Sequence, residues 1–432
     1  MLPVFDAKHT LDACLRSIAR QTVTELECVI VDDGSRDGSL EIAKAFAERD
    51  PRFRVIAAPH AGVSAATNRG IAGCRAPFVA RMDADDWMHR ERLARQLAAF
   101  DADPRLDAVG TRVRYFPRSR VGPGLREYET WLNRLHAPRR VHEDAYIECP
   151  VANPTLMFRA ERLRALGGYH DPDWPEDYDL VLRLLEAGGR LGGVRARLHG
   201  WRVHDARLTH TSPRYDVARF TACKAHHLAR GFLARHREYL LWGYGRTGRT
   251  LAKALRAHEK HAVAIVELHP GRLGQTIQGA SVISPHALGP PGRRPLLVSV
   301  AGAEPRALIR QELRRLGWRE LVDFRCAANG RSRSNASDTY ERFRTTPKRI
   351  IYTGRVDTLP SHDTVPRGTR RYRSGEAKCA DPYSSWTISF EPAGCSSTSS
   401  ATRASPSRKP ATVTTAGGSS STRALTWSSP TS

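Results

Sequence analysis

The sequence lacks any long apolar run. None of its 432 residues lies in a segment approaching the ~18–20 apolar residues that a membrane-spanning helix needs. The opening MLPVFDAKHT has neither the basic nor the apolar region of a signal peptide. With 40% hydrophobic and 26% charged residues, the composition is that of a globular protein. We therefore expect a cytoplasmic protein.

Cysteine pairs and acidic charge are also scarce. The eight cysteines are scattered without a CxxC pair or a disulfide-dense segment, which favours a reducing compartment. The formal net charge is +23, and residues 331–432 hold 16 basic and 7 acidic side chains, or +9 of that total. The remaining excess is dispersed arginine without a nucleic-acid-binding module. The sequence thus predicts no nucleic-acid partner and at most weak peripheral attraction to the anionic inner face of a membrane.

The C-terminal quarter has almost no apolar periodicity. About half of the last forty residues are Ser or Thr, which predicts a low-complexity, disordered tail over 329–432. Because this tail shares no patterning with the rest of the chain, we also consider the hypothesis that it results from a shifted reading frame. Resequencing the gene tests that hypothesis, since an intact frame encoding the same tail would refute it.

The first hundred residues alternate strand and helix patterns. Short apolar runs at LPVF, ECVIV, FRVIAAP and PFVARM predict strands, and apolar residues at Leu11, Leu15 and Ile18 predict a helix between the first two. Such β-α-β order predicts a mostly parallel sheet covered by helices. Ligands bind beyond the carboxyl ends of such strands, where both Asp32-Asp33 and the acidic stretch after Met82 fall.

The stretch MDADDW places Asp83, Asp85 and Asp86 within four positions. Like charges about 4 Å apart repel by on the order of 4 kcal/mol at an effective dielectric constant near 20. A divalent cation would turn that repulsion into a binding site, because hard cations prefer carboxylate oxygens. The alternative is that the acids merely begin the next helix, where negative charge is favourable.

These motifs resemble those of the family 2 glycosyltransferases, which have the nucleotide-sugar-binding GT-A fold. The resemblance covers about residues 2–210 and rests on LPVFD, VDDGS, GVSAATNRG, MDADDW, NPTLMFR, GGYHD, PEDYDLVLRL and WRVH, in that order. Relatives usually begin a few residues earlier, so a weakened first strand is expected. The fold class implied is α/β, with a Rossmann-like, mostly parallel sheet.

The resemblance implies a role for each matching residue. Asp33 would bind the nucleotide base, Asp32 would fix the turn beside it, and Gly167 and Gly168 would line the acceptor side. Asp85 and Asp86, with His204, would hold Mg2+ or Mn2+. The residues expected around the nucleotide sugar are Pro3, Phe5, Asp32, Asp33, Gly62, Asn68, Asp83 and Asp85.

Catalysis is expected at PEDYD, where Asp177 would be the general base and Glu176 its neighbour. One such base implies transfer with inversion. On helix chemistry alone, Glu176 and Asp177 could simply be first-turn residues of the next helix. The two roles are compatible, because one carboxylate can do both.

At Glu238 the strand and helix pattern restarts. The glycine motif GYGRTG (Gly243, Gly245 and Gly248) lies between a strand and a helix, and Glu267 ends the next strand, as in dinucleotide-binding domains. This region also resembles the N-terminal nucleotide-sugar-binding domain of bacterial sugar acyltransferases. Its candidate ligands are a nucleotide sugar, NAD(P) or none. We therefore predict a glycosyltransferase domain (1–213), a connecting helix (214–236) and a small Rossmann-like domain (237–328).

The leading hypothesis is an inverting glycosyltransferase that moves a sugar from a nucleoside diphosphate donor to a hydroxyl of a saccharide or lipid-linked acceptor, in cell-surface polysaccharide or glycolipid assembly. Two alternatives remain open. The chain could bind a nucleotide sugar without turning it over, or it could be an NAD(P)-dependent oxidoreductase that works through the second domain.

Overall fold

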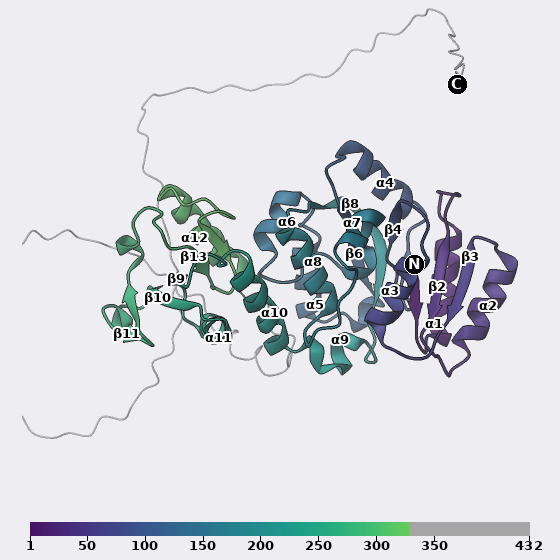
Figure 1. Ribbon diagram of the computed structural model, residues 1–432, viewed down its shortest axis with the longest axis horizontal. Coiled ribbons are helices and arrows are strands. Elements are labelled where there is room, and N and C mark those ends of the chain that lie inside the picture. The colour runs from purple at the N-terminus through teal and green to yellow at the C-terminus, as the bar shows by residue number, and fades with distance from the viewer. Residues whose placement is uncertain (329–432) are drawn as a thin grey trace, which may run out of the picture. The chain divides into compact units, whose positions relative to one another are not determined.

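A computed structural model describes residues 1–328, so the expectations for the tail lie outside the described residues. The chain opens with a parallel three-stranded sheet in the order β1-β2-β3 (Figure 1). Its strands and their helices are β1 (Leu2–Val4), α1 (Lys8–Ala19), β2 (Cys28–Asp32), α2 (Ser39–Arg49), β3 (Phe53–Ala57) and α3 (Val63–Gly73). Every residue of the central strand β2 is buried. The predicted apolar stripe of α1 is buried too, because its members recur at helical spacing.

A mixed five-stranded sheet follows, in the order β4-β7-β6-β8-β5. Its strands are β4 (Phe78–Ala80), β5 (Trp87–Met88), β6 (Ala108–Phe116), β7 (Met157–Arg159) and β8 (Leu191–Arg202). Strands β6 and β8 are parallel, whereas the other neighbours are antiparallel. At Met1 the two sheets meet: its amino group donates to the carbonyl of Ala80 (2.8 Å), and Met82 N–H donates to its carbonyl (3.3 Å). The strand predicted at PFVARM thus borders Met1, but it belongs to the second, mixed sheet and not to the parallel sheet of the first three strands, because its ladder pairs it with β7.

Helices and short turns join these strands. They are α4 (Arg92–Ala102), η1 (Arg118–Arg120), α5 (Pro123–Leu132), α6 (Pro138–Asp144), η2 (Asn153–Thr155), α7 (Ala160–Ala165), α8 (Glu176–Glu186), α9 (Leu208–Thr211), η3 (Pro213–Tyr215) and α10 (Val217–Arg230). Helix α10 lies within the span predicted as a connecting helix. None of the helices within residues 1–328 is both long and apolar enough to span a membrane.

The second parallel sheet that the sequence predicts is present after α10. Its elements are β9 (Glu238–Trp242), α11 (Arg246–Arg256), β10 (His261–Val266), η4 (Pro270–Arg272), β11 (Thr276–Ile277), β12 (Ala280–Ile283), η5 (Pro285–Ala287), β13 (Leu296–Val298), α12 (Ala303–Arg315) and β14 (Phe324–Cys326). The strand order is β11-β12-β10-β9-β13-β14, and β11 alone runs antiparallel to its neighbour. The α/β fold class with mostly parallel sheets is thereby confirmed.

Buried charged groups tie α10 and α12 to the helices of the first region. Lys224 Nζ donates to the carbonyls of Ile147 (2.7 Å) and Ala328 (2.9 Å). Arg310 contacts the carboxylates of Asp144 and Glu320 at 2.7 Å each. Apolar side chains of β9 and α11 also belong to the same buried cluster as those of α8 and α10. The domain boundaries drawn from the sequence remain predictions.

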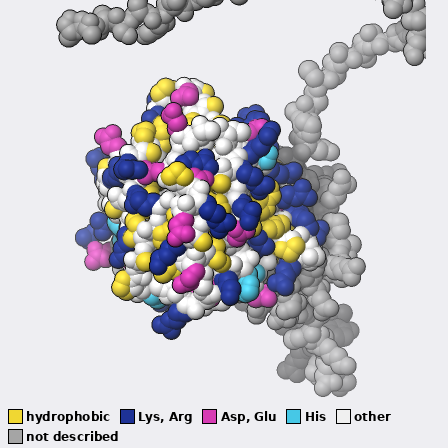
Figure 2. All heavy atoms as spheres, turned by 90° about the vertical axis from the view of Figure 1, so that its right-hand side faces the viewer, with side chains coloured by type: hydrophobic (Ala, Val, Ile, Leu, Met, Phe, Trp, Pro, Cys, Tyr) yellow, Lys and Arg dark blue, Asp and Glu magenta, His cyan; other side chains and the backbone are white. Residues whose placement is uncertain are grey.

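Basic side chains do not gather into one patch on the face that carries β1 to β3. Figure 2 shows Lys and Arg interspersed there with acidic, apolar and polar groups. A nucleic-acid-binding surface is normally a continuous basic patch or stripe. This face therefore does not have the character of such a surface.

Candidate active site

The acidic groups after β2 fix a turn and a neighbouring loop. Both carboxylate oxygens of the buried Asp33 accept backbone N–H bonds, from Ala61 and Gly62, at 2.9 Å each. Asp32 accepts the N–H groups of Gly34 and Ser35 through Oδ2 (3.2 Å each). Asp32 thus braces the turn, and Asp33 holds the loop that follows β3.

Two aromatic rings flank that loop. His60 Nδ1 lies 2.9 Å from Asp33 Oδ2, and the His60 ring lies 4.2 Å from the ring of Phe5, centroid to centroid. Phe5 is 47% exposed although it is a large apolar residue, so the pair offers a solvent-facing stacking surface. Pro3, one strand position before Val4, is half-buried in β1.

The three carboxylates after β4 form a cluster. One oxygen from each of Asp83, Asp85 and Asp86 lies within 4.8 Å of the other two. Asp83 Oδ1 contacts the buried guanidinium of Arg81 at 2.8 Å, and Asp85 Oδ2 lies 2.8 Å from His204 Nε2. Asp83 and Asp85 are half-buried and therefore accessible. Their oxygen donors, with the His204 nitrogen, are a ligand set that fits Mg2+ or Mn2+.

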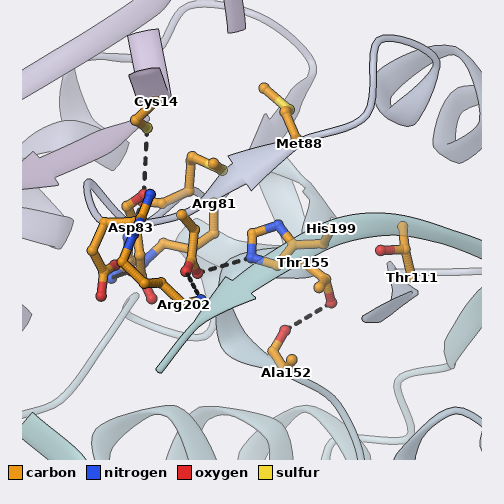
Figure 3. Close-up of polar contacts among 12 residues, drawn as sticks. Cys14, Arg81, Asp83, Met88, Thr111, Ala152, Thr155, His199 and Arg202 are labelled. Atoms are coloured by element: carbon orange, nitrogen blue, oxygen red, sulfur yellow. Dashed lines mark hydrogen bonds and ion pairs between the residues drawn. The ribbon is translucent and has the colours of Figure 1, made fainter. Parts of the chain in front are cut away.

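Asp86 has a different environment, because it is 1% exposed and both of its oxygens are used. Oδ2 lies 2.9 Å from His199 Nε2, and Oδ1 accepts the N–H of Arg202 at 2.7 Å (Figure 3). Burial and the negative charges of Asp85 and Asp83 raise the pKa of Asp86 well above its usual range. The geometry therefore favours Asp83 and Asp85 over Asp86 as groups that face a ligand.

A buried arginine stands behind this contact. Arg92 Nη1 lies 3.4 Å from His199 Nδ1, and Arg92 Nη2 donates to the carbonyl of Arg81. Burial lowers the pKa of His199 well below its usual range, so the ring is neutral. Because Arg92 can only donate, His199 Nδ1 must accept, which leaves its proton on Nε2 for Asp86. The chain Arg92–His199–Asp86 thus sets the orientation of the acidic loop.

Glu176 and Asp177 begin helix α8, after Pro175. Glu176 is 3% exposed, and its two oxygens accept from the hydroxyl of Tyr215 at 3.0 and 2.8 Å. Burial, with the adjacent negative charge of Asp177, raises the pKa of Glu176 to about 7. Asp177 is half-buried, and its Oδ1 accepts the N–H of Tyr178 at 2.7 Å. Asp177 thus lies in the first turn of α8 with a half-buried carboxylate.

The two acidic motifs share their electrostatic surroundings. Burial alone would lower the pKa of Arg81. The negative charges of Asp83 and, more weakly, of Glu176 outweigh burial and raise this pKa. Burial raises the pKa of Tyr169, and Asp83 and Asp177 are both among the charges that add to this rise. Arg81 and Tyr169 thus lie near enough to both MDADDW and PEDYD to feel the charges of each, although the two motifs are about ninety positions apart in the sequence.

The double glycine lies against Asn68. The side chain of Asn68 donates to the carbonyl of Tyr169 (2.6 Å) and accepts its N–H (2.8 Å). Gly168 has φ of 66°, and a Cβ there would lie 2.4 Å from Asn68 Oδ1. Only glycine fits this position. Asn68 and Gly62, both predicted beside the nucleotide, have structural contacts of their own: Asn68 holds the glycine turn, and Gly62 donates its N–H to Asp33. Their contact with a nucleotide stays a prediction.

Sequence reasoning missed several polar residues of the site. Arg81, Arg92, His199 and Tyr215 carry the contacts described above, yet each comes from a segment with no recognisable motif. A buried charge within an apolar strand, as in FVARM, was the available signal for Arg81. Gly243, Gly245, Gly248 and Glu267 belong to the β9–β14 sheet, not to this site.

Comparisons with known proteins agree with this architecture. A family model described as Glycosyl transferase family 2 matches residues 1–167. The chain is 39% identical over 106 residues to the glycosyltransferase GlyA of Streptococcus pneumoniae, covering 24% of this chain and 15% of GlyA. It is 31% identical over 244 residues to the O-antigen biosynthesis protein RfbC of Myxococcus xanthus, and this match covers 53% of this chain and 18% of RfbC.

One similar solved structure is that of TarS from S. aureus in complex with UDP-GlcNAc. The structural match covers 60% of this chain and 71% of the TarS chain, with 17% sequence identity and a TM-score of 0.45. The chain spans less than a fifth of the length of either curated relative. Residues 1–167, which hold the acidic cluster after β4, are therefore similar to the family 2 glycosyltransferases.

Proposed function

We propose that this chain transfers a sugar from a nucleoside diphosphate donor to a hydroxyl of its acceptor. The observation that supports the proposal is the contact of Arg81 Nη2 with Asp83 Oδ1 at 2.8 Å, together with the effect of the Glu176 charge on the pKa of the same arginine. The chain's relatives named as a glycosyltransferase and an O-antigen biosynthesis protein support the reaction class.

Asp83, Asp85 and His204 are proposed to hold Mg2+ or Mn2+ at the donor diphosphate. Bound there, the ion would neutralise the negative charge that grows on the leaving group. Asp86 is assigned the task of holding the loop, through His199 and the N–H of Arg202. Burial raises the pKa of Asp83, and the positive charges of Arg81 and Arg207 offset part of that rise. The Arg207 guanidinium, which lies over the Trp201 ring at 4.7 Å, is therefore proposed to contribute positive charge to the site.

The nucleotide base is proposed to stack on the Phe5–His60 pair at the end of β1. Asp33 accepts two backbone N–H bonds and its Oδ2 also faces His60 Nδ1 at 2.9 Å, so the remaining lone pair of Oδ1 is proposed for an N–H of the base. Stacking on aromatic rings tolerates different bases, so the donor nucleotide is set by the Asp33 contact. Pro3 fixes the course of β1 beneath these groups.

Asp177 is proposed as the general base that removes the proton of the acceptor hydroxyl. It is accessible at the start of α8, next to Glu176, whose pKa of about 7 is set by burial. A single base on the acceptor side, with no second carboxylate assigned as nucleophile, implies one displacement and inversion at the anomeric carbon. Gly167 and Gly168 are proposed to line the acceptor side, where their turn is held by Asn68.

By analogy with the relative in O-antigen biosynthesis, the acceptor is proposed to be a saccharide or a lipid-linked saccharide of the cell surface. The enzyme would then work in the cytoplasm, at the inner face of the membrane, without spanning it.

A donor panel tests the proposal. Purified full-length chain is incubated with nucleoside diphosphate sugars of different bases and sugars, with Mn2+ present, and nucleoside diphosphate release is measured. We expect one donor to be hydrolysed slowly without acceptor and faster with cell-surface glycan fragments. Donor binding without release would instead support a binding protein, and hydride transfer to or from NAD(P) would support an oxidoreductase; either result would overturn the proposal.

A further inference from the structure

In the sheet formed by β9 to β14, the strand order reverses at β9. Strand β10 follows β9 on one side, whereas β13 lies on the other, and all three are parallel. In open α/β sheets, ligands bind at the carboxyl ends of the strands where the order reverses in this way. The glycine motif and the N-terminus of α11 lie at this point, directly after β9 (Figure 1).

The three glycines of the motif meet three different geometric demands. Gly243 has φ of 92°, which side chains rarely adopt. A Cβ on Gly248 would lie 2.1 Å from the carbonyl oxygen of Gly243, so this glycine lets α11 pack on the strand end. Gly245, by contrast, has an ordinary φ of −70° and would meet nothing within 4 Å. Neither packing nor backbone conformation therefore requires a glycine at position 245. The backbone there borders open space.

The start of α11 offers unused hydrogen-bond donors to that space. The N–H groups of Arg246, Thr247 and Gly248 find no acceptor within the described residues, and the cap residue Gly245 has no side chain to supply one. The first turn carries Arg246 and Arg249 and no acid. The positive end of the helix dipole and the positive charges of the two arginines thus both favour binding of an anion at this helix start.

A second feature comes from the neighbouring strand. Ser299, directly after β13, is 2% exposed, and its Oγ has no hydrogen-bond partner within residues 1–328. A Cβ on Gly248 would lie 3.8 Å from the Cβ of Ser299, so the Ser299 side chain begins next to the first turn of α11. A buried, unpaired hydroxyl is costly to a fold and needs an explanation.

From these features we infer that the β9–α11 turn, with Ser299, binds the diphosphate of a nucleotide. The ligand's phosphate oxygens would accept the free N–H groups of α11, and a small shift of the β13 loop would bring Ser299 Oγ to them. This site is separate from the proposed transferase site and does not depend on it.

The carboxylate at the ribose position is already engaged within the protein. Glu267 directly follows β10, where a free carboxylate would accept the ribose hydroxyls. Here its Oε2 pairs with Arg272 at 3.1 Å and its Oε1 accepts the N–H of Leu268 at 2.9 Å. With this carboxylate already paired, the diphosphate carries the recognition. ADP is therefore expected to bind as well as NAD+.

Hydrogen–deuterium exchange of the full-length chain, with and without ADP, tests the inference. The amides of residues 246–248 lack acceptors, so they should exchange fast alone and slow down when ADP is added. UDP and NAD+ are run in parallel to separate a free nucleoside diphosphate from a dinucleotide. Protection confined to residues 1–213, or none at millimolar ADP, would overturn the inference.

Two substitutions sharpen the test. Gly245→Asp and Gly245→Asn both cap α11 and fit the open space, but they differ by one negative charge. We expect Gly245→Asp to weaken ADP binding about tenfold more than Gly245→Asn, since a like charge would face the diphosphate. Ser299→Ala should weaken ADP binding several-fold without lowering the unfolding temperature, because no described group bonds to the hydroxyl. Equal binding by both Gly245 variants and the wild type would contradict the assignment.

Discussion

The hydroxyl of Tyr215 lies within hydrogen-bond distance of both carboxylate oxygens of Glu176, at 3.0 and 2.8 Å. One donor therefore holds a buried acid whose charged form is already disfavoured by burial and by Asp177. Tyr215 lies in η3, outside the residues that the family model matches. A residue beyond the matched segment thus orients Glu176, which lies next to the proposed base Asp177.

Tyr215→Phe should shift the pH dependence of transfer. The hydrogen bond from Tyr215 favours the charged form of Glu176, so its loss raises the pKa of Glu176 further above about 7. If Glu176 must be ionised, the acidic limb of the rate profile moves to higher pH, by about one unit. The measurement is kcat/KM against pH for the wild type and the variant.

Tyr239→Phe is the matched control for that experiment. Tyr239 is 1% exposed on β9, and its hydroxyl has no hydrogen-bond partner among the described residues. Its removal should leave the pH profile of transfer in place. A profile that is also unchanged in Tyr215→Phe would mean that Glu176 does not need its charge.

Removing divalent cations should abolish transfer. Without a cation, the oxygens of Asp83, Asp85 and Asp86 repel one another and the donor diphosphate. We expect EDTA to stop nucleoside diphosphate release and added Mn2+ or Mg2+ to restore it. Full activity after exhaustive chelation would refute the proposed cation site.

Asp85→Asn should raise the Mn2+ concentration needed for half-maximal activity by at least about tenfold, because one charged ligand is lost. Asp101→Asn, which removes an exposed acid at the end of α4, is the control and should behave as wild type. If Asp86→Asn changed the Mn2+ requirement and Asp85→Asn did not, the ligand assignment would be reversed.

Arg310→Ala should strongly destabilise the fold. The substitution leaves the buried carboxylates of Asp144 and Glu320 without their shared cation, at a cost of about 3–5 kcal/mol in the free energy of unfolding. Arg315→Ala, which breaks an exposed pair with Glu312 on the same helix, should have no measurable effect. Urea denaturation compares the two variants. Equal effects would show that the buried ion pairs do not hold α12 to α6.

His227 should contribute stability at low pH. Burial lowers its pKa, but hydrogen bonds with Asp179 (3.2 Å) and Glu186 (3.0 Å) outweigh burial and raise it. A raised pKa in the folded state stabilises the fold below the unfolded value of about 6.5, and this contribution is lost as pH rises through the folded pKa. The groups nearby are Arg183, which also pairs with Asp179, His170 and His226.

The test compares the free energy of unfolding of the wild type and His227→Gln across this range. The wild-type advantage should be largest near pH 6 and should shrink toward alkaline pH. His9→Gln, at an exposed position of α1, serves as control. An advantage that stayed constant with pH would mean that His227 is neutral in the fold.

The elements of the fold could be predicted where apolar periodicity is strong. Helix α1 and strand β2 follow directly from the spacing of their apolar residues. The antiparallel return of β7 beside β4 could not be predicted, because nothing in MFR indicates its partner. Pairing between distant strands depends on the whole tertiary arrangement, which short segments do not encode.

The acidic residues of the site could be predicted from the sequence, but the separate role of each residue could not. The sequence placed Asp85 and Asp86 together as metal ligands, yet burial and the contact with His199 distinguish Asp86 from its neighbours. Asn68 similarly proves to hold the glycine turn through Tyr169. Such roles depend on contacts between residues about a hundred positions apart, and one sequence carries no signal for them.

Transfer and donor binding by Asp177→Asn test the central claim most directly. Asn keeps the size of the side chain but cannot accept the acceptor's proton, so we expect transfer to fall at least ~100-fold while donor affinity is unchanged. Asp173→Asn, at an exposed neighbouring position, should retain full activity. Near wild-type transfer by Asp177→Asn would contradict the account.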